Sequence, residues 1–192
     1  MDLAPLVASF VLVALAELGD KTQIAVITLS SQFKAFSVFS SAMLAFLLTT
    51  GIAVAIGDAL KLLPLLWLHV TAATIFLIFG FYTILMVISR KGEGAQVKTK
   101  NARNAVFSSF SLITLMELGD KTQFAVIALS AQYEFPLLVY LGVMLAFALI
   151  TGLGATVGTT LTKFVPLKHI QLGSGIIFIL FGIVFLINAI LG

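Results

Sequence analysis

The sequence predicts an all-α integral membrane protein with six transmembrane helices, arranged as two inverted three-helix repeats. Three observations lead to this fold class. Hydrophobic residues make up 60% of the 192-residue chain and charged residues only 10%, whereas soluble domains carry about 25% charged residues. The apolar residues form six runs, each long enough to cross a bilayer as a helix. Finally, each half carries the same motif, Glu-Leu-Gly-Asp-Lys-Thr-Gln, starting at Glu17 and again at Glu117.

Short polar or proline-containing segments separate the six runs, which sets the boundaries of the expected helices. The expected spans are residues 4–30, 36–58, 66–89, 105–130, 136–158 and 168–190. The first run lacks a basic region before it and contains charged residues, so we interpret it as a retained helix rather than a signal peptide. The chain contains no cysteine, which excludes disulfides and thiolate metal sites.

A basic segment between the two halves predicts the orientation in the membrane. Residues 90–104 form a polar linker between a first repeat, residues 1–89, and a second repeat, residues 105–192. Because Lys and Arg accumulate in cytoplasmic loops, the linker is expected to be cytoplasmic and both termini outside the cell membrane. Apart from the two motif lysines, eight basic residues then lie inside and only Lys61 outside. With three helices each, the halves enter the membrane from opposite sides, as in many secondary transporters.

The repeated motif places charged side chains deep in the bilayer. Residues 17–30 and 117–130 differ at only two positions. Glu17 follows the start of its helix by about thirteen residues, which is near mid-bilayer at about 1.5 Å per residue. A charge at that depth costs roughly 2.5–3.5 kcal/mol, so the charged motif residues are expected to face one another, water or an ion. On a continuous helix Thr22 would point away from the acids. It would lie near them only if the helix opened locally at Gly19.

These side chains predict a site for a hard divalent cation, because carboxylate, amide and hydroxyl oxygens suit Ca²⁺, Mn²⁺ or Mg²⁺ better than Zn²⁺ or Cu⁺. The expected metal ligands are Glu17, Asp20, Gln23, Glu117, Asp120 and Gln123. The residues expected to balance charge or gate the site are Lys21 and Lys121, and the supporting hydroxyls are Thr22, Thr122, Thr50 and Thr151. Four carboxylates and two ammonium groups leave a net charge of minus two, which one divalent cation neutralises. Crowded, desolvated carboxylates also hold protons, so metal and protons are expected to compete, which is the basis of antiport.

The two motifs resemble the hallmark of the GDT1 family, also called UPF0016, which is a duplicated E-φ-G-D-[KR]-[TS] in a protein of six or seven helices. The resemblance covers essentially the whole chain. It implies transport of Mn²⁺ or Ca²⁺ in exchange for protons, with Mn²⁺ export in several prokaryotic members. It also implies that the motif acids form the cation site. The long acidic central loop of eukaryotic members has no counterpart here, so the resemblance implies a prokaryotic member.

Other functions remain open from the residues alone. A passive divalent-cation channel or a structural subunit would also place acids in the membrane, although neither requires matched halves. An intramembrane aspartyl protease uses one Asp in each of two unlike helices and needs no repeated Glu, Lys and Thr. We therefore expect a transporter rather than an enzyme, with no permanent cofactor and no nucleic-acid partner. Asp58, His69 and His169 lie near helix ends and are interpreted as interfacial residues.

The expected orientation can be tested with a single cysteine at Gln96 in the linker, because the chain contains no other cysteine. An impermeant thiol reagent should leave this cysteine unmodified in intact cells and modify it after the membrane is opened. A cysteine at Lys61 is the matched control and should react in intact cells. Modification of the linker cysteine in intact cells would reverse the orientation.

Overall fold

The computed structural model describes residues 3–89, 105–164 and 167–191, and all regular elements within these ranges are α-helices. In chain order they are α1 (Ala4–Glu17), α2 (Lys21–Gln32), α3 (Ala35–Leu60), α4 (Leu65–Ile88), α5 (Ala105–Glu117), α6 (Lys121–Gln132), α7 (Pro136–Phe164) and α8 (Leu167–Leu191). The expected all-α fold is confirmed. The linker at residues 90–104 lies outside the described residues, so the orientation stays a prediction.

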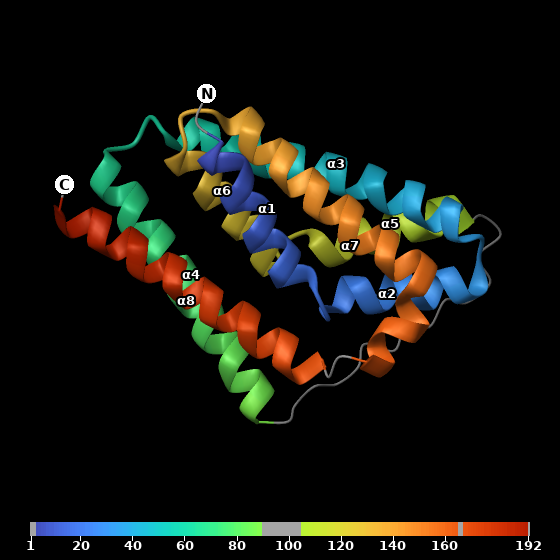
Figure 1. The fold of residues 1–192 in the computed structure, drawn as a ribbon. Helices are drawn as coiled ribbons and strands as arrows, with labels where there is room; N and C mark the ends of the chain where they lie inside the picture. Colours follow the sequence, from blue (N-terminus) through green and yellow to red (C-terminus); the bar gives the residue numbers. More distant parts are fainter. Residues whose placement is uncertain (1–2, 90–104, 165–166, 192) are drawn as a thin grey trace.

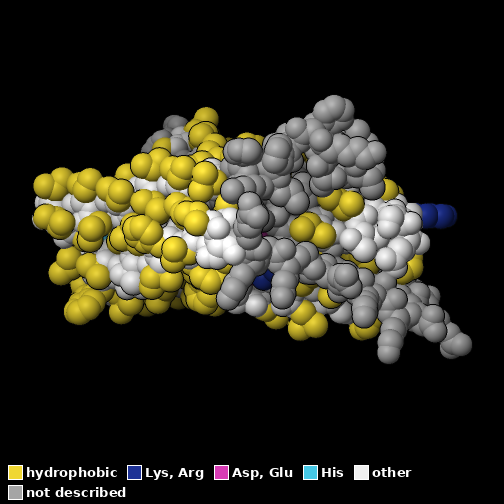
Figure 2. Space-filling model, turned by 90° about the horizontal axis from the view of Figure 1, so that it is seen from below, with side chains coloured by type: hydrophobic (Ala, Val, Ile, Leu, Met, Phe, Trp, Pro, Cys, Tyr) yellow, Lys and Arg dark blue, Asp and Glu magenta, His cyan; other side chains and the backbone are white. Residues whose placement is uncertain are grey.

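The outer surface of the bundle is apolar. Within the described ranges, four helices are long and apolar enough to cross a membrane, in α3, α4, α7 and α8. Large hydrophobic side chains such as Phe36 and Leu62 are exposed, at 79% and 91%. Figure 2 shows hydrophobic side chains over much of one face, with Lys or Arg visible at few points. Such a surface is compatible with lipid rather than water, so the chain is a multi-pass membrane protein.

The structure differs from the six expected helices at the two motifs, where the first and fourth spans are each divided in two. α1 ends at Glu17 and α2 begins at Lys21, and α5 and α6 are separated at the same positions of the second motif. Gly19 and Gly119 have positive φ angles of 72° and 75°. Glycine adopts this left-handed conformation without the strain that a Cβ atom causes. The sequence left open whether the helix opens at Gly19, and the structure shows that it does.

Corresponding helices of the two halves run in opposite directions. Figure 1 shows α3 antiparallel to α7, and α4 antiparallel to α8. Several residues contact their own counterparts from the other half. The rings of Phe46 and Phe147 stack with centroids 3.8 Å apart, and those of Phe76 and Phe178 lie 5.5 Å apart. A residue can touch its repeat counterpart only close to the axis that relates the halves, so these phenylalanines lie along that axis.

The two halves do not pack identically, however. A Cβ atom on Gly57 of α3 would lie 2.7 Å from Ser130 Cβ of α6, so these helices are in close contact. Ser130 also donates a hydrogen bond of 3.0 Å to the carbonyl oxygen of Val54. Its counterpart Ser30 has a buried hydroxyl with no hydrogen-bond partner. A hydrogen bond from Ser130 therefore joins α3 and α6. Ser30 forms no such bond in the other half.

This close contact predicts that Gly57→Ala lowers the melting temperature of the detergent-solubilised protein. The added methyl group would overlap α6, and overpacking of this kind costs about 1–3 kcal/mol. Gly51→Ala is the matched control on the same helix, because nothing lies within 4 Å of its added Cβ atom. The melting temperatures are measured by the fluorescence of Trp67. Equal values for the two variants would show that α3 and α6 are not in close contact.

Candidate cation site

The two motifs open in the same way, and their glutamines brace the opened turns. The amide oxygen of Gln23 accepts a hydrogen bond of 2.5 Å from the backbone N–H of Gly19. Gln123 accepts the equivalent bond of 2.7 Å from Gly119. Both glutamines were expected as metal ligands. In this structure their amide oxygens satisfy backbone donors that the broken helix leaves without an intrahelical partner.

Each motif lysine pairs with the aspartate of the opposite motif. Lys21 Nζ lies 2.6 Å from Asp120 Oδ1, and Lys121 Nζ lies 3.0 Å from Asp20 Oδ1. The aspartate side chains are mostly buried, with 13% exposure for Asp120 and 18% for Asp20. This arrangement fits the expected charge-balancing role of the lysines. An unbroken helix would instead have placed Lys21 beside the acids of its own motif.

The two glutamates are held by threonines from the opposite motif. Thr22 Oγ1 donates a hydrogen bond of 2.7 Å to Glu117 Oε1. Thr122 Oγ1 donates one of 2.6 Å to Glu17 Oε1. Both glutamates are 2% exposed, and in the described part of the chain neither forms an ion pair. The two glutamates are therefore the carboxylates whose charge the lysines leave uncompensated.

Three carboxylates from the two motifs converge. One oxygen each from Glu17, Asp20 and Asp120 lies within 4.8 Å of the others. The second oxygens of both aspartates, Oδ2, are buried and accept no hydrogen bond. A buried acceptor without a partner costs about 1–3 kcal/mol, and more when it is charged. A cation bound among these oxygens would satisfy them. Glu117 is not part of this group of three.

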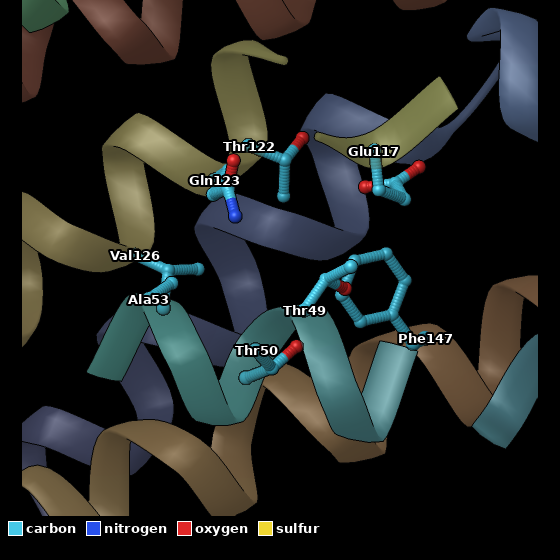
Figure 3. A pocket seen from close by; sticks show the side chains of 8 residues that line it. All are labelled: Thr49, Thr50, Ala53, Glu117, Thr122, Gln123, Val126 and Phe147. Atoms are coloured by element: carbon cyan, nitrogen blue, oxygen red, sulfur yellow. The ribbon is translucent and has the colours of Figure 1, made fainter. Parts of the chain in front are cut away.

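Glu117 instead forms one wall of a small adjacent cavity of about 10 Å³. The cavity is lined by Thr49, Thr50, Ala53, Glu117, Thr122, Gln123, Val126 and Phe147. Side chains of α5 and α6 lie on one side, opposite those of α3 (Figure 3). Thr50 was an expected supporting residue, and its counterpart Thr151 is buried but does not line this cavity. Thr49 was not expected, because its repeat counterpart is Ile150 and the two halves do not match at this position.

Asp58 and His69 belong neither to the group of three carboxylates nor to the lining of the cavity. Asp58 pairs with Lys61 at 2.8 Å, and its side chain is 54% exposed. This agrees with its interpretation as an interfacial residue. His69 is partly buried near the start of α4. The side chain of His169 lies outside the described residues.

Two broken helices from oppositely directed halves, with carboxylates gathered where the breaks meet, define the architecture of a membrane transporter. The chain belongs to the GDT1 family: the sequence profile described as divalent cation/proton antiporter GDT1 matches residues 5–91 and 105–192. Members of this family are transporters, so the aspartyl protease alternative is excluded.

Several curated proteins are similar over most of the chain. GDT1-like protein 5 of rice is 28% identical, covering 91% of this chain and 90% of the relative. A GDT1-like protein of Schizosaccharomyces pombe is 27% identical, with 88% and 84% covered. A protein of Vibrio cholerae named as a candidate manganese exporter is 33% identical, with 67% and 62% covered. No solved structure matches the chain.

The crossed ion pairs predict energetic coupling between the halves. Lys121→Met and Asp20→Asn should each lower the free energy of unfolding, because each leaves a charge without its partner. The double variant should lose less than the two single variants added together, with a coupling of about 0.5–3 kcal/mol. The free energies of unfolding of the wild type, the two single variants and the double variant can be measured by SDS titration in mixed micelles.

The exposed pair Lys61–Asp58 provides the matched control, and its coupling should be about 0–1 kcal/mol. Additive effects at Lys121 and Asp20 would show that this pair does not connect the halves.

Proposed function

We propose that the protein exports a divalent cation from the cytoplasm across the cell membrane in exchange for protons, with Mn²⁺ as the favoured ion and Ca²⁺ next. The ion binds between the two motifs. The observation that carries this proposal is the group formed by Glu17, Asp20 and Asp120. Its two aspartates present buried Oδ2 atoms that accept no hydrogen bond.

The chemistry of the donors supports a hard cation. Among the described residues the motifs supply carboxylate and hydroxyl oxygens but no imidazole, and the chain contains no cysteine. Such oxygens suit Mn²⁺, Ca²⁺ and Mg²⁺. The similarity to the Vibrio cholerae protein named as a candidate manganese exporter favours Mn²⁺ among them.

The balance of charge supports exchange for protons. Each aspartate has a lysine partner from the opposite half, which leaves the charges of Glu17 and Glu117. One divalent cation or two protons neutralise these two charges equally well. Since unbound carboxylates in an apolar bundle favour the protonated form, metal binding should release protons. Exchange of two protons for each ion would move no net charge.

The arrangement of the halves supports alternating access. Because the repeats are inverted, rocking of one half against the other would open the site to each side of the membrane in turn. We assign residues 1–89 and 105–192 to these two halves. With the linker at residues 90–104 in the cytoplasm, an inward proton gradient would drive the cation outward.

The test is transport by the purified protein in liposomes, with a metal-sensitive dye, imposed pH gradients and the voltage clamped by K⁺ and valinomycin. A proton gradient should drive Mn²⁺ or Ca²⁺ in the opposite direction. Glu17→Gln and Glu117→Gln should each reduce exchange to background, because an amide of equal size carries no charge to exchange. Asp58→Asn is the control, since it neutralises an exposed carboxylate away from the site, and it should transport normally.

Acidification should weaken metal binding, because protons occupy the same carboxylates and the metal must displace them. Metal flux that ignores the proton gradient, without counter-movement of protons, would identify a passive channel. Wild-type exchange by either glutamine variant would show that the glutamates do not carry the ion.

A further inference from the structure

The cavity beside Glu117 interrupts the symmetry of the site. Most residues that line it have an equivalent in the other half, including Glu117 with Glu17 and Phe147 with Phe46. Thr49 is different, because the corresponding residue of the second half is Ile150. The wall that α3 contributes therefore carries two hydroxyls, from Thr49 and Thr50, where the repeat-related positions of α7 carry one.

Thr49 is held in a way that leaves oxygen lone pairs available. Its side chain is 4% exposed. The hydroxyl donates its proton to the carbonyl oxygen of Ala45 at 3.0 Å, one turn earlier in α3. A hydroxyl has one proton and two acceptor lone pairs. Since the proton is directed to the backbone, the lone pairs are what Thr49 can offer to a group in the cavity. A cation is the kind of group that accepts them.

The size of the cavity makes such a neutral ligand important. Its volume of about 10 Å³ is close to the space that one water molecule needs. A cation that enters must therefore leave most of its hydration water outside. Protein oxygens must replace those water molecules, and Glu117 alone supplies too few for the six or more ligands that Ca²⁺ takes.

We propose that Thr49 is a ligand of the transported divalent cation at a second position, in the cavity beside Glu117 and off the axis between the halves, which the ion occupies in addition to the group formed by Glu17, Asp20 and Asp120. This inference rests on the proposed function. The first half contributes the hydroxyl oxygen of Thr49, whereas Ile150 at the repeat-related position has no oxygen in its side chain. Because Mg²⁺ gives up its water reluctantly, the same cavity discriminates against Mg²⁺.

The experiment measures Mn²⁺ binding to the purified full-length protein in nanodiscs, using the electron paramagnetic resonance signal of free Mn²⁺. Thr49→Val replaces the hydroxyl by a methyl group of similar shape. It should weaken Mn²⁺ binding at least about tenfold, as expected when a charged group loses one polar partner, at an unchanged melting temperature. Ile150→Val, at the repeat-related position, is the matched control and should bind Mn²⁺ as the wild type does.

If Thr49→Val fails to fold, Thr49→Ser and Thr49→Ala decide the question. Serine keeps the hydroxyl and should keep the affinity, whereas alanine should lose it. Equal affinities for serine and alanine, or wild-type affinity for Thr49→Val, would overturn the proposal. The proposed function would survive that result if Glu117→Gln still lost Mn²⁺ binding. Absence of Mn²⁺ and Ca²⁺ exchange in the wild type would instead overturn the proposed function itself.

Discussion

Charge compensation between the halves is the constraint on which the rest of this structure depends. Of the six charged motif side chains, five are largely buried in an apolar bundle and Lys21 is 40% exposed. An isolated charge in such a bundle is expensive. Each motif finds its partners in the opposite motif: lysine with aspartate, and threonine with glutamate. The broken helices make these contacts possible, because the opened turn at Gly19 gives Lys21 and Thr22 a direction that a continuous helix denies them. The inverted fold brings the two opened turns face to face.

The compensation of charge leaves the two glutamates without a charged partner. The lysines offset the aspartates, while the glutamates accept hydroxyl hydrogen bonds that carry no charge. A site neutralised throughout would bind a divalent cation more weakly, and a site with four free carboxylates would be difficult to bury. Two uncompensated charges match one divalent ion or two protons. Under the proposed function, these two charges make the empty, unprotonated site the unfavourable state, which would favour exchange over leakage.

The sequence was sufficient to predict the all-α membrane fold and the repeated motif, and it singled out the motif carboxylates that lie together in the structure. It did not predict that each lysine pairs with the aspartate of the opposite motif, because Lys21 lies within reach of its own motif on an ideal helix. The division of the first and fourth spans was also uncertain, since the apolar run continues on both sides of Gly19. Thr49 could not be predicted for another reason. Comparison of the repeats selects residues that match, and Thr49 is informative because Ile150 does not match it.

The crossed contacts also constrain how the protein is made. Lys21 and Asp120 are 99 residues apart in the chain, and Thr122 and Glu17 are 105 apart. A ribosome delivers the first half to the membrane before any of these partners exists. The first motif must therefore wait, still hydrated or held by the insertion machinery, until the second motif arrives. Final burial of the first helices is thus a late event in biosynthesis, and it takes place as the second half enters the bilayer.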